Sequence, residues 1–128
     1  RASYKKEYFL GARDQVTLLE GDQEIVPGIR VEVFSGHTRY LQGVWINSRE
    51  EEALYISDLS PTAANIPYVW IPALDIYPMD TLKNKKRVLP LLAQRKTLVI
   101  FAHDPQTPAV RLRDEGRNVE VEPVQFES

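Results

Sequence analysis

The chain has 128 residues and a mass of 14.7 kDa, which suits one domain with its own hydrophobic core. Sixteen basic and eighteen acidic side chains give a net charge of −2, so charge gives no reason to expect nucleic acid or an anionic membrane as a partner. The absence of cysteine excludes disulfides, thiolate metal sites and cysteine nucleophiles. No apolar run approaches the roughly 20 residues of a membrane-spanning helix. We therefore expect a cytoplasmic protein that does not enter a membrane.

The first half of the sequence predicts a helix end followed by a β-meander. Residues 3–12 are expected to be the last turns of a helix that stops at Gly11. Two short strands, over residues 15–20 and 23–26, are joined by a Gly21-Asp22 turn. Apolar and polar residues then alternate over a strand at 29–34, and two further strands are expected at 41–46 and 53–56.

The second half combines a long loop, one helix and three strands. Four prolines within residues 60–78 forbid a regular ladder or helix there. A helix is expected over residues 81–94, capped by Asp80 and kinked or shortened by Pro90. Strands are predicted at 97–102, 110–113 and 119–124. The whole chain, residues 1–128, is expected to form a single α+β domain with a mostly antiparallel or mixed sheet and one main helix.

Three potential metal ligands follow three of these strands. His37 comes after the strand at 29–34, Asp58 after the strand at 53–56, and His103 after the strand at 97–102. Strands whose carboxyl ends meet at one sheet edge would bring these side chains together, and imidazole and carboxylate suit zinc, iron and manganese. Gly36 fits a ligand loop that turns sharply. Each of the three can equally be a hydrogen-bonding loop residue, so a non-catalytic β-rich binding or scaffold domain with incidental histidines stays the alternative.

The order of three short motifs is more specific than any one of them. Ser-Gly-His-Thr at 35–38, Ile-Ser-Asp-Leu at 56–59 and Phe-Ala-His-Asp-Pro at 101–105 occur with a long loop and a helix before the last. This arrangement resembles the second half of the metallo-β-lactamase fold hydrolases and covers roughly residues 16–113. The resemblance implies the β-rich half of an αββα sandwich.

The same resemblance implies a role for each ligand. His37 would bind a first metal ion, Asp58 would bridge two ions and orient the attacking water in catalysis, and His103 would complete the second. The implied cofactor is a pair of zinc ions, with iron or manganese as other options. The implied activity is that of a metal-dependent hydrolase, which activates water to cleave an ester, lactone or similar bond of a small-molecule substrate.

One departure from the family pattern concerns the missing ligands. The family's His-X-His-X-Asp-His motif is absent, and two histidines in total cannot supply it. We therefore expect that Arg1 is not the natural beginning and that the chain is a carboxyl-terminal portion, inactive and metal-free by itself. An uncovered inner sheet face would then associate with the missing amino-terminal half or with a second copy as a dimer. A smaller departure is Arg39, where the family commonly continues with Pro-Gly-His.

Residues around the three ligands carry further expectations. The loop at 60–78 follows Asp58 directly, so its aromatic residues are candidates for an apolar substrate pocket, although Trp70 can equally fill the core. Asp104 is expected to cap the turn into Pro105 rather than to support His103. The basic run at 83–87 is expected to be a solvated helix face rather than a nucleic-acid site. The candidate pocket residues are Tyr68, Trp70 and Tyr77.

Overall fold

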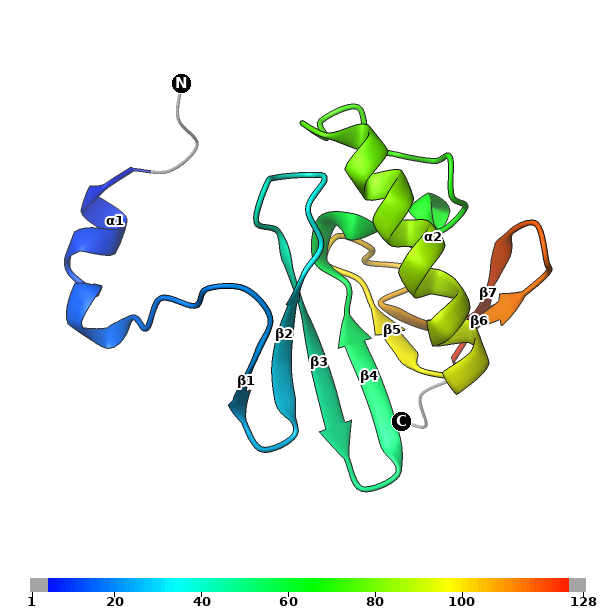
Figure 1. Ribbon diagram of the computed structural model, residues 1–128, viewed down its shortest axis with the longest axis horizontal. Coiled ribbons are helices and arrows are strands. Elements are labelled where there is room, and N and C mark those ends of the chain that lie inside the picture. Colours follow the sequence, from blue (N-terminus) through cyan, green and yellow to red (C-terminus); the bar gives the residue numbers. More distant parts are fainter. Residues whose placement is uncertain (1–4, 125–128) are drawn as a thin grey trace.

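The computed structural model describes residues 5–124, and these residues build one seven-stranded sheet in which spatial order follows chain order. A single long helix lies across one face of the sheet, and a short helix lies in an amino-terminal arm that extends away from it (Figure 1). The helices are α1 (Glu7–Leu10) and α2 (Pro78–Arg95). The strands are β1 (Gln23–Val26), β2 (Ile29–Val33), β3 (Gln42–Ser48), β4 (Glu51–Tyr55), β5 (Leu98–Ile100), β6 (Ala109–Asp114) and β7 (Val119–Pro123).

The sheet is mixed, because one of its six strand pairs is parallel. β4 and β5 run in the same direction, whereas every other neighbouring pair is antiparallel. A parallel pair requires a crossover connection, and residues 56–97, which include α2, provide it. The expected α+β fold with one main helix and a mixed sheet is therefore confirmed.

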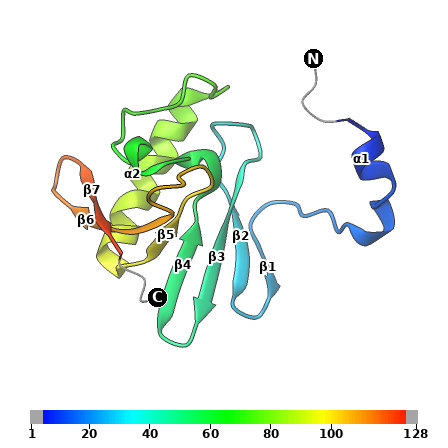
Figure 2. The same cartoon turned by 180° about the vertical axis from the view of Figure 1, so that it is seen from behind.

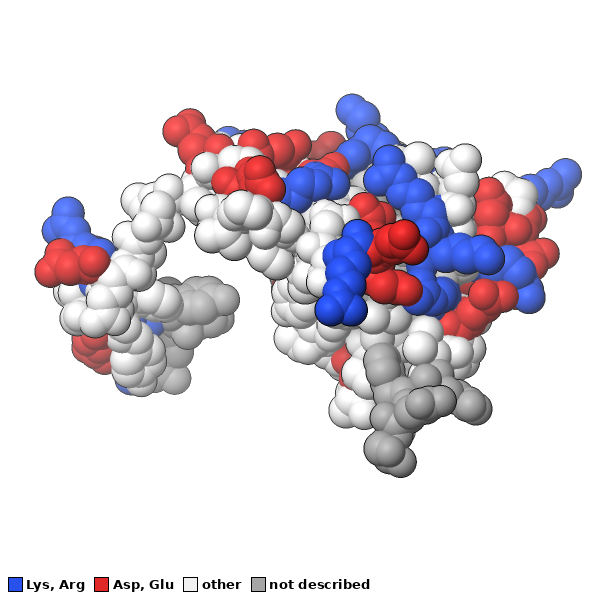
Figure 3. All heavy atoms as spheres, turned by 90° about the horizontal axis from the view of Figure 1, so that it is seen from below, with Lys and Arg blue, Asp and Glu red and all other residues white. Residues whose placement is uncertain are grey.

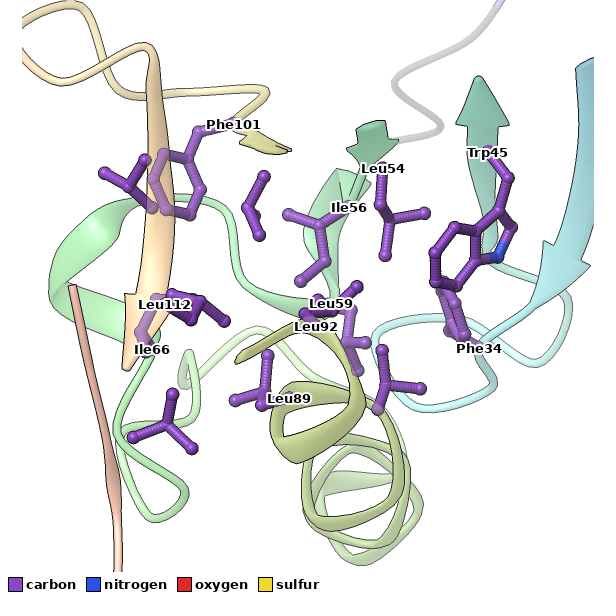
Figure 4. Packing of buried hydrophobic residues seen from close by; sticks show 14 residues of the cluster. Phe34, Trp45, Leu54, Ile56, Leu59, Ile66, Leu89, Leu92, Phe101 and Leu112 are labelled. Carbon is purple, nitrogen blue, oxygen red and sulfur yellow. The ribbon is translucent and has the colours of Figure 1, made fainter. Parts of the chain in front are cut away.

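The hydrophobic core lies between α2 and one face of the sheet (Figure 4). Paired residues of β3, β4, β5 and β6 point to this face, and the inner side of α2 packs on them. Each fully buried aliphatic or aromatic side chain contributes about 1.5–3 kcal/mol to stability, so this layer is the main source of hydrophobic stabilisation. Its fully buried members include Phe34, Leu54, Ile56, Ile66, Leu89, Leu92, Val99 and Val110.

The opposite face of the sheet is also apolar, but no helix of residues 5–124 covers it (Figure 2). Alternate residues of β2, β3, β4 and β5 form this surface, and the strand register places them side by side. We call it the helix-free face. Its side chains are Ile29, Val31, Val33, Val44, Ile46, Ala53, Tyr55, Leu98 and Ile100.

The amino-terminal segment departs from the predicted pattern. The strand expected at 15–20 is wrong: the chain makes a 3-10 turn at Arg13–Gln15 and then runs on unpaired to the turn before β1. The Asp22 carboxylate accepts a hydrogen bond from Val33 N (2.7 Å) and so satisfies a backbone donor at the end of β2. The expected helix end is confirmed, because Gly11 is the C-cap of α1. Residues 3 and 4 of that prediction lie outside the described residues.

The main helix begins earlier than predicted and is not shortened by its proline. Tyr77 is the N-cap and Pro78 occupies the first turn, so the prediction that Asp80 caps the helix is wrong. Pro at the first helical position is favourable because the missing N–H has no partner there. The helix continues through Pro90 to Arg95 and ends at Lys96, which adopts the left-handed conformation.

Acidic and basic side chains are interspersed on the charged surface seen in Figure 3. The basic run of α2 is only partly solvated, contrary to expectation: Lys86 is exposed, but Lys85 is fully buried. Arg87 Nη1 donates to the buried Glu32 carboxylate (2.7 Å), which also accepts from Trp45 Nε1 (2.7 Å). Within residues 5–124, no helix is long and apolar enough to cross a lipid bilayer.

Candidate metal centre

The strand order brings the three predicted ligands to one edge of the sheet. β2 and β4 are both antiparallel to β3, and β5 is parallel to β4, so β2, β4 and β5 all run in the same direction. Their carboxyl ends therefore lie at the same edge (Figure 1). His37, Asp58 and His103 each follow one of these ends by three or four residues.

The Asp58 carboxylate lies between the two imidazole rings. Its Oδ2 is 3.8 Å from His37 Nε2, and its Oδ1 is 3.0 Å from His103 Nε2. Each carboxylate oxygen thus faces a different ring. The side chains of His37 and Asp58 are 26% exposed, whereas that of His103 is 64% exposed, so the centre opens to the surface on the His103 side.

His37 is held on its other side by a buried carboxylate. Its Nδ1 lies 2.9 Å from Asp75 Oδ1, and the Asp75 side chain is completely buried. The second oxygen of Asp75 accepts a hydrogen bond from Thr81 Oγ1 (2.6 Å), at the start of α2. Since a carboxylate only accepts hydrogen bonds, Nδ1 is the donor in this contact, and the ring presents its Nε2 toward Asp58.

The His37 loop depends on the close approach of Gly36 to α2. A Cβ atom on residue 36 would lie 2.1 Å from Thr81 Oγ1 and 2.7 Å from Thr81 N. Gly36 O accepts the hydrogen bond of Tyr77 N (2.8 Å), the N-cap of α2. The glycine therefore lets the backbone pass directly over the helix start, which explains the residue that the sequence placed beside the histidine.

Asp104 fixes the loop that carries His103. Its Oδ1 accepts hydrogen bonds from Thr107 N (2.8 Å) and Gln106 N (3.2 Å), and its Oδ2 accepts from Ala63 N (3.0 Å). The bond from Ala63, followed by the one from Thr107, lowers the pKa of this carboxyl group. The predicted cap of the turn is confirmed. In addition, the carboxylate joins the His103 loop to the loop that follows Asp58.

Two residues of the centre, Asp75 and Thr81, were absent from the sequence-based hypothesis. The signal in the sequence was a single acidic residue within the apolar run at 71–77. Among residues 5–124, no group of three or more His, Asp and Glu side chains is arranged to hold a metal ion by itself. The residues nevertheless have the right chemistry for a shared centre, because two imidazole Nε2 atoms face the two oxygens of one carboxylate.

Of the three aromatic residues predicted for a substrate pocket, only Trp70 lines the groove beside β7. Trp70 is 63% exposed and lines a groove of about 480 Å³ between residues 63–67 and β7, so it does not fill the core. Neither Tyr68 nor Tyr77 lines this groove. Tyr68 packs against the core, and burial raises the pKa of its hydroxyl. Tyr77 lies beneath the Arg39 guanidinium, 5.8 Å from the ring centroid.

Comparison with known proteins finds hydrolases, as the arrangement of His37, Asp58 and His103 suggests. No family model matches the chain. N-acyl homoserine lactonase from Bacillus thuringiensis is 28% identical over 105 residues, which are 81% of this chain and 41% of that protein. The chain thus spans less than half the length of the curated relatives that it matches.

Solved structures show the same partial coverage. A probable metal-dependent hydrolase from Staphylococcus aureus is 29% identical, with a TM-score of 0.78 over 91% of this chain and 42% of its own. AidC, a dizinc quorum-quenching lactonase, is 19% identical (TM-score 0.74; 91% of this chain, 40% of its own). A third structure, the hydrolase AbOPH of the β-lactamase superfamily, is 14% identical (TM-score 0.78; 96% of this chain, 44% of its own).

The fold and the order of the three strand-end residues thus match the β-rich half of a metallo-β-lactamase-like fold. Within that class, the sequence similarity is to a probable metal-dependent hydrolase and to an N-acyl homoserine lactonase.

Proposed function

We propose that this chain forms the β-rich part of a metal-dependent hydrolase that uses zinc to cleave an ester, lactone or similar bond in a small molecule. The observation that carries the proposal is the place of the Asp58 carboxylate, with one oxygen toward His37 Nε2 and the other toward His103 Nε2. A carboxylate between two separate imidazoles is arranged to bridge two cations. The dizinc lactonase among the structural neighbours supports zinc as the metal.

The donors fit zinc, since neutral imidazole nitrogen and carboxylate oxygen are its ordinary ligands. Bound zinc would supply an activated water and would polarise the bond under attack. In this proposal His37 and His103 would each hold one ion, and the Asp58 carboxylate would be shared between them. Asp75 keeps the His37 Nε2 lone pair directed at the centre. Iron and manganese accept the same donors, so metal analysis is part of the test.

Two four-coordinate ions need more donors than this chain provides. We propose that the remaining ligands come from polypeptide beyond residues 1–128, corresponding to the part of the relatives that the chain does not span. The helix-free face is the surface on which that polypeptide would pack, because its apolar side chains have no helix over them. Without this partner, we expect the chain to bind no zinc tightly and to be inactive.

The first experiment measures metal content and turnover in the complete protein. Asp58→Asn keeps the size of the side chain but removes the charge needed between two ions, so zinc per protein should fall from two to one or fewer. Hydrolysis of an N-acyl homoserine lactone, used as the probe substrate, should be lost with it. Asp14→Asn is the matched control, because this exposed residue lies in the amino-terminal arm. Full zinc content and turnover in Asp58→Asn would overturn the proposal.

A second experiment tests the helix-free face and the alternative function. Light scattering on residues 1–128 alone should give a species larger than 14.7 kDa, because the apolar face would pair with a second copy. A monomer with a flat thermal baseline would show that the face needs no partner. Together with metal-free complete protein, that result would favour a β-rich scaffold in which the two histidines are incidental.

A further inference from the structure

Lys85 is a buried charge for which the proposed reaction has no direct use. It lies in the middle of α2, and its side chain is fully buried. A lysine ammonium is almost never fully buried unless its charge is compensated. Here burial lowers the pKa of the ammonium to about 8, and the charge of Asp75 acts in the opposite direction.

The ammonium is also the hydrogen-bonding centre of the loop before α2. Lys85 Nζ donates to the carbonyl oxygens of Asn65 (2.5 Å), Pro67 (2.7 Å) and Trp70 (3.3 Å). An ammonium has three donors and no acceptor, so all three are used within six residues of one loop. This loop contains four prolines between residues 60 and 78 and has little regular backbone pairing of its own.

The loop that Lys85 holds leads to both histidines of the candidate metal centre. On one side, Asp75 holds His37 Nδ1 (2.9 Å). On the other side, the clamped loop continues back to residues 61–63, where Pro61 O accepts from His103 N (3.0 Å) and Ala63 N donates to Asp104. Lys85 thus holds a loop that carries Asp75 on one side and the contacts to the His103 loop on the other.

We propose that Lys85 is a positioning residue of the metal centre, whose buried ammonium holds the loop at residues 65–70 and, through this loop, keeps Asp75 hydrogen-bonded to His37. The inference rests on the proposed function for its link to zinc, but its effect on His37 does not. Removing Lys85 leaves three carbonyl oxygens of this loop without their donor. The loop then loses its fixed position, and Asp75, which lies five residues after Trp70, no longer fixes the imidazole ring.

The test uses two variants and one matched control in the complete protein. Lys85→Met removes charge and donors while keeping the length of the side chain. Lys85→Gln removes the charge but retains amide donors for the loop carbonyls, and so remains informative if the methionine variant does not fold. Lys86→Met removes the same charge from the exposed neighbouring position of the same helix.

The first readout is made on metal-free protein and is independent of zinc. Nitrogen-15 NMR of the histidine rings should show His37 as one tautomer, with a slowly exchanging Nδ1 proton, in the wild type and in Lys86→Met. In Lys85→Met and Lys85→Gln the Nδ1 proton should exchange at least ten times faster, and the ring should populate both tautomers. An unchanged His37 signal in both Lys85 variants would overturn the proposal.

The second readout is zinc affinity by competition with a chelator. Loss of a residue that orients a ligand typically costs 10–100-fold in metal affinity, so Lys85→Met should bind zinc 10–100-fold more weakly and Lys86→Met within twofold of the wild type. If Lys85 acts through Asp75, the Asp75→Asn/Lys85→Met double variant should bind no more weakly than Asp75→Asn alone; additive losses would contradict that route. Asp58→Asn separates the two proposals. Zinc binding unaffected by Asp58→Asn would refute the metal centre, whereas the His37 readout would still decide the role of Lys85.

Discussion

The contact between Gly36 and α2 makes Gly36→Ala the sharpest test of how the metal centre is built. The new Cβ would lie 2.1 Å from Thr81 Oγ1, 2.7 Å from Thr81 N and 2.8 Å from Thr81 Cα. Two of these three atoms are backbone, so a rotamer change cannot relieve the overlap. Either the His37 loop or the start of α2 must move.

The magnitude of this effect follows from the two interactions that the movement disturbs. Inserting a methyl group into a well-packed region costs about 1–3 kcal/mol. Displacing Thr81 also removes its hydrogen bond to the Asp75 carboxylate (2.6 Å), and a bond to a charged group contributes about 1.5–3 kcal/mol. The expected loss of unfolding free energy is therefore about 2.5–6 kcal/mol. For a domain of this size it corresponds to a fall in melting temperature of about 10–20 °C.

Thermal unfolding, monitored by circular dichroism, measures this loss directly, and the His37 ring reports the change at the centre. With Thr81 displaced, Asp75 loses one of its partners and the exchange of the His37 Nδ1 proton should accelerate. Gly11→Ala is the matched control, because a Cβ at residue 11 would meet nothing within 4 Å. A melting temperature of Gly36→Ala within 2 °C of the wild type would refute the reasoning, since it would mean that the backbone does not pass so close to the helix.

Three further predictions concern residues around the centre. Burial lowers the Lys85 pKa from 10.5 to about 8, so between these pH values the folded protein binds fewer protons than the unfolded chain. The unfolding free energy of the wild type, measured relative to Lys85→Met in urea titrations, should therefore rise by about 3 kcal/mol from pH 7 to pH 11. A difference that does not change with pH would contradict the lowered pKa. Hydrogen bonds, first that from Ala63, lower the pKa of Asp104. The stabilisation by this carboxylate is therefore present above its ordinary pKa of 3.8 and is lost as the pH falls through the lowered pKa. Asp104→Asn should destabilise the protein at pH 7 and not at pH 2 in the same titrations, and equal destabilisation at both pH values would show that the charge is not involved. Trp70 is 63% exposed, so Trp70→Ala should change the unfolding free energy by no more than about 0.5 kcal/mol, and a larger loss would place the indole in the core.

The sequence predicted the centre as far as local pattern allows. Strands could be located by alternation, and the residues that follow them, His37, Asp58 and His103, could be named before their spatial relation was known. The structure adds the relation: one parallel pair, β4 with β5, aligns the three carboxyl ends at one edge. Strand direction depends on which strands pair across the chain, and a local window of sequence does not contain that information.

The supporting residues could not be predicted for a related reason. Asp75, Thr81 and Lys85 lie in a loop and a helix whose local patterns indicate only an irregular segment and an amphipathic helix. Their roles arise from contacts across 38 residues for Asp75 with His37, and 20 or fewer for Lys85 with the loop carbonyls. The burial of Lys85 also contradicts the ordinary preference of lysine for solvent, which local reasoning applies by default. The strand predicted at 15–20 was wrong for a different reason, because the residues there find no partner strand.

The single parallel pair also has a consequence for how the molecule folds. The hairpins β1–β2, β2–β3, β3–β4 and β6–β7 join neighbours along the chain, so each can form early at little cost in loop-closure entropy. Joining β4 to β5 requires closure of a connection of 42 residues, counted from Ile56 to Thr97, and pairings of such separation form slowly. His103 meets Asp58 only at that step. We therefore expect the imidazole and carboxylate that face each other across this junction to come together late in folding, so that their contact can serve as a kinetic marker for the completed sheet.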